Sequence, residues 1–141
     1  IKLPYNDCGA VYELDVDENY EATNMKAVIT GTPIAEDANG NTCSLEGISN
    51  PDNVTFMPGT DILTIGEDTG NHENNMIWNF NVETKELTRI ITTPVGAETT
   101  SPFWYDDVNG FQYMTAVTQH PDETTQDQGE SSVGVLGPIA Q

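Results

Sequence analysis

Residues 53–92 read NVTFMPGTDILTIGEDTGNHENNMIWNFNVETKELTRIIT, and this stretch decides the predicted fold. Apolar and polar side chains alternate in four short segments, which predicts strands over residues 53–57, 61–66, 76–82 and 86–92. The sequence Pro58-Gly59-Thr60-Asp61 is a turn signal between the first two segments, and polar residues 83–86 connect the last two. The stretch therefore predicts a four-stranded antiparallel meander of about 40 residues, the size of one β-propeller blade.

Apolar and polar residues also alternate in other parts of the chain, as they do in strands, and we identify no helix there. Residues 10–16 and 25–30 predict two half-buried strands, which would be the outer half of an earlier blade. Residues 101–107 and 110–117, joined by the hairpin signal Asn109-Gly110, would open the next blade. The predicted fold class is all-β: part of a β-propeller, with about one complete four-stranded blade and parts of two others.

Three further segments complete a single predicted domain over residues 1–141. Residues 31–50 are rich in turn-forming residues and predict a long loop, and residues 121–132 predict a polar loop. Residues 133–140 are apolar and predict either a closing strand or a segment docked on another part of the protein. Because there is no initiator Met and no signal segment, we expect a mature or excised piece, the C-terminal fragment of a longer protein.

The charge of the chain restricts its partners. The sequence has 23 acidic residues against 4 basic ones, a formal net charge of -19. Such a surface repels nucleic acid phosphates and anionic lipid, and no apolar run approaches the ~20 residues of a membrane helix, so we expect neither partner. The acidic surface would attract divalent cations. Solubility or salt adaptation is the alternative explanation of the acidic surface, but it does not explain why acidic residues cluster in two loops.

The two cysteines leave two interpretations open. Cys8 and Cys43 are too far apart in sequence for a C-x-x-C redox or zinc motif. In an exported protein they form a disulfide, and otherwise they are free buried thiols.

The two acidic loops have the composition of a calcium site. Residues 50–56 and 66–75 place carboxylates, amides and the imidazole of His72 around one predicted hairpin. Calcium takes several oxygen ligands, which Asp, Glu, Asn and backbone carbonyls in loops supply. Glu67 and Asp68 are therefore candidate metal ligands, although both could simply end a strand.

Four motifs in register resemble a known family. They are Asn50-Pro51-Asp52-Asn53, the polar loop that follows the short hairpin, Thr93-Pro94-Val95-Gly96-Ala97-Glu98-Thr99-Thr100, and Gln119-His120-Pro121-Asp122-Glu123. Over roughly residues 8–125 their order and spacing resemble the C-terminal part of PhoX-type alkaline phosphatases. The resemblance implies a six-bladed β-propeller, secreted or periplasmic, that hydrolyses phosphoesters with calcium and iron. The rest of the propeller would come from a missing N-terminal region or another chain, and we expect the fragment to be inactive alone.

The resemblance also implies metal ligands. Asp52 matches the Pro-Asp of the family's strand-opening loop, and Glu98 matches the Glu of its Gly-x-Glu-x-Thr motif. His120 and Glu123 match its Gln-His-Pro-x-Glu motif. The chain departs from the family at Asn53, where Gly is usual, and at Ala97, where Cys is usual. The resemblance identifies no catalytic residue here.

The scarcity of basic residues favours metal-dependent chemistry. A phosphoryl-transfer site needs positive charge on the phosphate oxygens, and with four Lys and Arg residues this chain would obtain it from metal ions. Two alternatives stay open. The chain could be a non-catalytic calcium-binding β-propeller module, or part of a propeller lactonase that also uses calcium.

Overall fold

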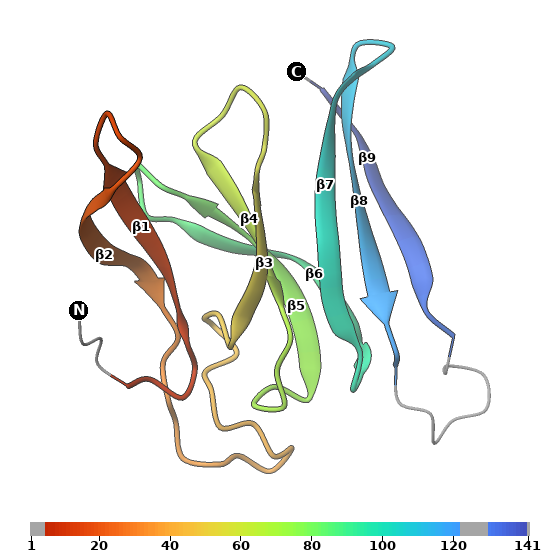
Figure 1. Cartoon of the computed structure of the whole chain (residues 1–141). Coiled ribbons are helices and arrows are strands. Elements are labelled where there is room, and N and C mark those ends of the chain that lie inside the picture. The colour runs from red at the N-terminus through yellow and green to blue at the C-terminus, as the bar shows by residue number, and fades with distance from the viewer. Residues whose placement is uncertain (1–4, 122–129, 141) are drawn as a thin grey trace.

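The computed structural model of the chain describes residues 5–121 and 130–140 (Figure 1). Within them the named elements are nine strands: β1 (Ala10–Val16), β2 (Ala22–Thr30), β3 (Pro51–Phe56), β4 (Ile62–Glu67), β5 (Asn74–Asn81), β6 (Leu87–Val95), β7 (Glu98–Val108), β8 (Phe111–Gln119) and β9 (Ser132–Ala140). All of their pairings are antiparallel, so the all-β prediction is confirmed. The described residues include no helix long and apolar enough to cross a membrane.

The strands form three sheets. The N-terminal sheet has the order β1-β2, the central sheet β3-β4-β5-β6, and the C-terminal sheet β7-β8-β9. The central sheet is the predicted four-stranded meander, which is confirmed. Residues 133–140, for which the sequence left two alternatives, belong to β9 and pair with β8.

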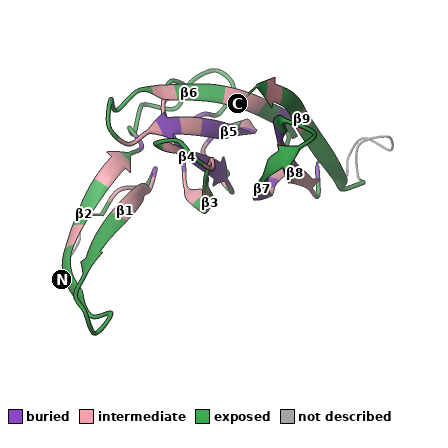
Figure 2. Cartoon of the chain, turned by 90° about the horizontal axis from the view of Figure 1, so that it is seen from above, coloured by how far each residue is buried: buried purple, intermediate pink, exposed green. Residues whose placement is uncertain are grey.

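The two middle strands of the central sheet, β4 and β5, are buried on both faces (Figure 2). Trp78 faces the core shared with the N-terminal sheet, and its neighbour Ile77 faces the core shared with the C-terminal sheet. The first core consists of Ile48, Leu63, Ile65, Met76, Trp78 and Phe80. The second consists of Ile77, Trp104, Met114 and Ala116. Burial on both faces places β4 and β5 in the interior of the domain.

Four prolines lie inside strands, and each is on an edge strand: Pro51 on β3, Pro94 on β6, Pro102 on β7 and Pro138 on β9. Proline has no N–H to donate, so an edge strand tolerates it and a central strand does not. The edge position of Pro94 lets β6 continue to Val95, beyond the predicted end at residue 92.

The long connections lie at one end of the sheets, the lower end in Figure 1. At this end β3, β5 and β7 begin and β4, β6 and β8 end; we call it the loop face. The opposite end carries short turns. In the β3–β4 turn, Gly59 has φ +71° and follows Pro58, and the N–H of Thr60 donates to Met57 O (3.3 Å). Proline followed by a left-handed glycine suits a type II turn, which explains why the sequence predicted this hairpin.

The long loop at residues 31–50 is fixed by a disulfide. Cys8 and Cys43 are bonded, with a Cα–Cα distance of 5.8 Å, and both are fully buried. The disulfide interpretation is therefore the correct one of the two that the sequence left open. Gly31 lies against the bridge, because a Cβ there would be 2.5 Å from the Cβ of Cys8. The disulfide and Gly31 hold the start of the loop against the N-terminal segment.

Replacing Cys43 with alanine should lower the free energy of unfolding by about 3–4 kcal/mol, because the bridge shortens a large loop of the unfolded chain. The two cysteines are separated by 35 residues. Urea unfolding followed by tryptophan fluorescence measures the loss. Cys8→Ala should give the same loss, and two losses below about 1 kcal/mol would contradict a stabilising disulfide.

Candidate functional site

Two of the predicted ligands meet at the loop face. Glu98 is the first residue of β7 and pairs in register with Gln119, so His120 follows directly at the end of β8. His120 has φ 32°, a left-handed conformation that a residue other than glycine rarely adopts. Glu98 Oε2 and His120 Nε2 lie 3.1 Å apart. The side chain of Glu98 is 12% accessible and that of His120 is 55%, so this pair is open to solvent on the imidazole side.

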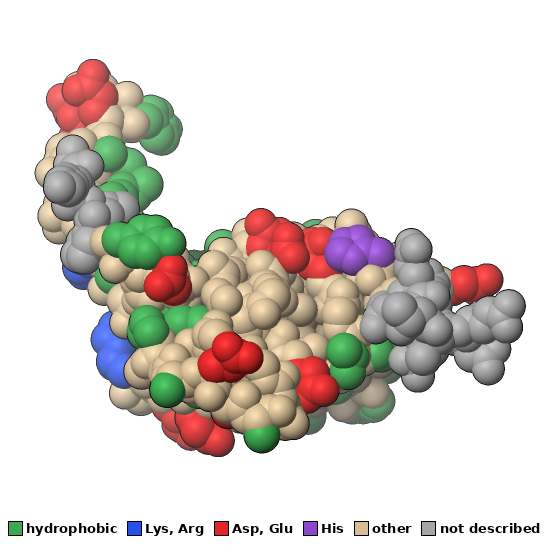
Figure 3. Space-filling model, turned by 90° about the horizontal axis from the view of Figure 1, so that it is seen from below, with side chains coloured by type: hydrophobic (Ala, Val, Ile, Leu, Met, Phe, Trp, Pro, Cys, Tyr) green, Lys and Arg blue, Asp and Glu red, His purple; other side chains and the backbone are tan. Residues whose placement is uncertain are grey.

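Asp52 and Asp68 lie at the same end of the sheets. Asp52 is the second residue of β3 and is exposed, and Asp68 is exposed directly after β4. Asn53, next to Asp52, accepts hydrogen bonds from the N–H of Ser101 (3.0 Å) and the hydroxyl of Thr100 (3.2 Å), which ties the start of β3 to β7. Figure 3 views this end and shows an exposed histidine beside acidic side chains. Within the described ranges, however, no group of three or more His, Cys, Asp or Glu side chains is arranged to hold a metal.

Glu123, a further predicted ligand, lies outside the described residues. Of the five predicted ligands considered so far, the structure therefore brings Glu98 and His120 into contact and leaves Asp52 and Asp68 exposed at the same end. Whether any of them binds a metal stays a prediction.

Glu67 has a different environment from the other predicted ligands. Its side chain is fully buried, and its carboxylate accepts hydrogen bonds from the N–H groups of Ser49 (2.9 Å) and Met76 (2.9 Å) and from Trp78 Nε1 (2.7 Å). A further contact joins Glu67 Oε2 to His72 Nδ1 at 3.1 Å. Four protein groups thus surround this carboxylate, which is the usual way that a buried charge is stabilised.

His72 joins this carboxylate to the long loop. Its Nδ1 lies 3.1 Å from Glu67 Oε2, and its Nε2 lies 3.2 Å from the carbonyl oxygen of Ser44. The buried Glu67–His72 contact therefore links the β4–β5 connection to the loop at residues 31–50. Sequence reasoning missed it, because the partners of Glu67 come from residues 49, 72, 76 and 78.

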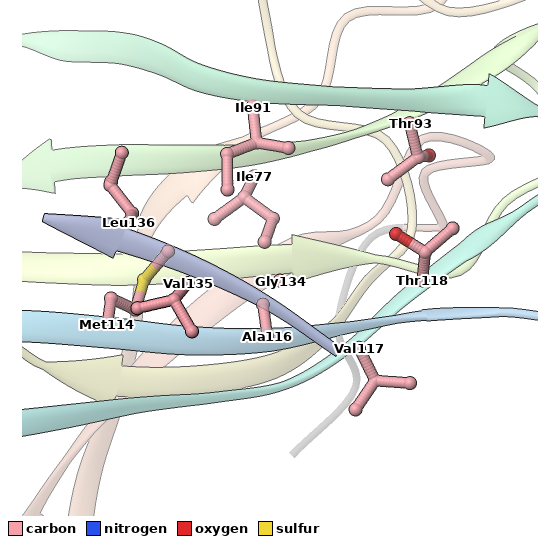
Figure 4. A pocket seen from close by; sticks show the side chains of 10 residues that line it. All are labelled: Ile77, Ile91, Thr93, Met114, Ala116, Val117, Thr118, Gly134, Val135 and Leu136. Atoms are coloured by element: carbon pink, nitrogen blue, oxygen red, sulfur yellow. The ribbon is translucent and has the colours of Figure 1, made fainter. Parts of the chain in front are cut away.

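The cavity between the central and C-terminal sheets is not a candidate site for this chemistry. It has a volume of about 150 Å³ and is lined mostly by aliphatic side chains, with two threonines (Figure 4). No charged side chain lines it. A phosphate or a cation would lose its hydration there without gaining a partner.

A second carboxylate organises the long loop. Asp37 Oδ2 accepts a hydrogen bond from Asn41 Nδ2 (2.8 Å), and Oδ1 accepts from the N–H groups of Asn39 (2.8 Å) and Asn41 (3.0 Å). The hydrogen bond from the Asn41 side chain, followed by the one from its backbone, lowers the pKa of Asp37 below its ordinary value of 3.8.

No protein family, curated protein or solved structure gave a match to this chain. The function is therefore argued from the residues and the geometry above.

Asp37→Asn should reduce the stability of the protein at neutral pH and have less effect in acid. The folded pKa of Asp37 lies below the unfolded pKa, so its contribution is present above the unfolded pKa and is lost as pH falls through the folded pKa. Urea unfolding of both proteins from neutral pH down to pH values below 3.8 measures this difference. A difference between the two proteins that stays constant over this range would contradict the role of Asp37.

Glu67→Gln should lower the free energy of unfolding by roughly 3 kcal/mol, because the amide has one acceptor oxygen where the carboxylate has two. Its NH2 group would point at buried N–H groups that themselves donate, and these would lose their acceptor. Asp68→Asn is the matched control: its side chain is exposed, and we expect a change below about 0.5 kcal/mol. Thermal unfolding of the two variants distinguishes these outcomes, and equal effects would contradict the structural role of the buried Glu67 carboxylate.

Proposed function

We propose that the loop face binds divalent cations through Glu98 and His120, and that this chain is part of a metal-dependent phosphoesterase of the PhoX type. The observation that carries the proposal is the 3.1 Å contact between Glu98 Oε2 and His120 Nε2. The resemblance assigned these two residues to separate motifs. They are 22 residues apart in the sequence, and their side chains are nevertheless in contact.

The chemistry of this pair fits the metals that the resemblance implies. A carboxylate oxygen suits calcium, and carboxylate with imidazole suits iron. The two described residues supply a partial ligand set, to which Asp52, Asp68 and Glu123 are the candidate additions. Glu67 is not part of the proposed site, because its carboxylate is already surrounded by the N–H groups of Ser49, Met76 and Trp78 and by the imidazole of His72.

The positions of the basic residues also support a role for cations. Lys26 Nζ is paired with Glu13 (3.1 Å) in the middle of the N-terminal sheet, and Lys85 lies in the β5–β6 turn at the opposite end from the loop face. Arg89 lies near the start of β6, also away from the loop face. A phosphoester bound among Glu98, His120 and Asp52 would therefore meet no described basic side chain. Bound cations would supply the positive charge that its oxygens need.

The packing of the sheets supports a β-propeller as the parent fold. A propeller arranges four-stranded antiparallel sheets around a channel. Here β3 and β7, the first strands of two consecutive sheets, contact each other, and Asn53 joins them through Thr100 and Ser101 (Figure 2). We propose that the central sheet is a complete blade, that the other two sheets are partial blades, and that the parent protein is exported.

A non-catalytic calcium-binding module is the second candidate. The small number of ligands favours this candidate: among the described candidate ligands, only Glu98 and His120 are in contact. The same end of the molecule would then bind calcium for stability and would hydrolyse nothing.

Elemental analysis of the purified chain, before and after chelation, should find calcium together with iron if the phosphatase proposal is correct. Glu98→Gln and His120→Asn should each reduce metal content or affinity at least tenfold, since each removes a ligand. Glu86→Gln is the matched control, because Glu86 is an exposed carboxylate beside the β5–β6 turn.

The outcomes separate the candidates. Calcium without iron, and no hydrolysis of p-nitrophenyl phosphate by the assembled protein, would favour the binding module. Equal metal binding by all three variants would remove Glu98 and His120 from the site.

A further inference from the structure

One face of the central sheet is only partly covered. Phe56, Leu63 and Phe80 form one cross-strand row on β3, β4 and β5. Leu63 is 6% exposed and Phe80 2%, whereas Phe56 is 56% exposed. The next row repeats the pattern, since Val54 on β3 is 53% exposed and its partner Ile65 is fully buried. The N-terminal sheet therefore covers β4 and β5 and leaves β3 bare.

A groove lies beside this bare strand. It has a volume of about 580 Å³ and runs between the N-terminal and central sheets, with apolar walls from Val11, Val28, Val54, Phe56, Leu63 and Val82. Figures 1 and 2 both show β1, and not β2, on the side that faces β3. Of the described strands, β1 pairs only with β2, so its other backbone edge is open toward the groove. An open edge beside an apolar groove is a binding site for an added β-strand.

The charge of the groove suits a polypeptide. Lys26 and Lys85 line it together with Glu13 and Glu83, so two basic residues balance two acidic ones. The chain as a whole has a net charge of -19 from 23 acidic and 4 basic residues. The groove is thus a locally neutral part of an acidic surface. An apolar, weakly charged strand meets no repulsion there.

The β1–β2 hairpin is similar in construction to the β5–β6 hairpin. Asp17 Oδ1 accepts from two backbone N–H groups of the first turn, and Asn81 Oδ1 does the same in the second. Each turn also contains one left-handed residue, Tyr20 (φ 63°) and Lys85 (φ 65°). In the central sheet the other edge of β5 is paired with β4, which forms a hairpin with β3. The corresponding edge of β1 is bare.

We propose that β1 binds a β-hairpin from another polypeptide segment, which pairs with it as the β3–β4 hairpin pairs with β5 and covers Val54 and Phe56. The added strands would turn the two-stranded N-terminal sheet into a four-stranded one. Their apolar side chains would fill the groove at alternate positions. This inference develops the partner expected from the proposed propeller, and it does not depend on metal binding or hydrolysis.

The chain contains a suitable probe, its own β3–β4 hairpin. A fluorescent synthetic peptide of residues 50–67, added to the intact chain, should bind saturably with a dissociation constant in the micromolar range, measured by fluorescence anisotropy. A scrambled peptide and a peptide N-methylated at alternate positions of residues 62–66 should bind at least tenfold more weakly, since the latter loses its edge hydrogen bonds.

A matched pair of variants locates the binding site. Phe56→Asp should weaken peptide binding at least tenfold, and Val135→Asp, at another exposed apolar residue, on β9, should change it less than twofold. Hydrogen exchange on the unaltered chain gives an independent measurement: the peptide should protect amides of residues 11–15.

Three results would overturn the inference. They are no saturable binding by the intact chain, protection of residues 132–140 in place of residues 11–15, or a dimer whose β1 amides are protected before peptide is added. The last result would assign the groove to a second copy of the chain. Peptide binding without metal binding would support this inference and reject the proposed metal chemistry. Metal binding without peptide binding would reject this inference and leave the proposed metal chemistry in place.

Discussion

The fold depends on the buried carboxylate of Glu67. Its side chain accepts hydrogen bonds from the long loop and from β5 and contacts His72 in the β4–β5 connection. Its backbone N–H donates to Thr99 Oγ1 on β7 (2.6 Å). One residue thus joins the central sheet to the segments on both of its faces. Because a buried carboxylate without partners costs several kcal/mol, the loop, the connection and the two strands must take up their positions together.

The same contacts determine where the candidate ligands lie. Gly66 lets β4 approach β7 closely, since a Cβ there would be 2.8 Å from the carbonyl oxygen of Thr99. Successive side chains of a strand point to opposite sides, so the buried Thr99 leaves its neighbour Glu98 near the surface, beside His120. Packing of Thr99 inside the domain therefore positions Glu98, whose carboxylate contacts His120.

Local patterns in the sequence predicted the strands and the meander, because alternation and turn residues depend on near neighbours. The same patterns predicted strand ends poorly at the loop face, where buried threonines such as Thr93 extend the strands through hydrogen bonds to residues far along the chain. Sequence spacing alone also left open whether Cys8 and Cys43 form a disulfide. For the candidate site, motif order identified Glu98 and His120, but their contact arises from strand register and from the left-handed backbone of His120. The burial of Glu67 depends on donors scattered from residue 49 to residue 78, which no local pattern reveals.

The prolines of the edge strands have a consequence for aggregation. Exposed strand edges recruit other chains and start cross-β growth, and a proline interrupts the row of donors that such growth needs. The edge strands β3, β6, β7 and β9 each contain a proline, whereas β1 and β2 contain none. The central and C-terminal sheets are therefore protected at their borders, and of the three described sheets the N-terminal one alone lacks this protection. An added strand would therefore pair more readily with the N-terminal sheet than with the proline-containing edges of the other two sheets.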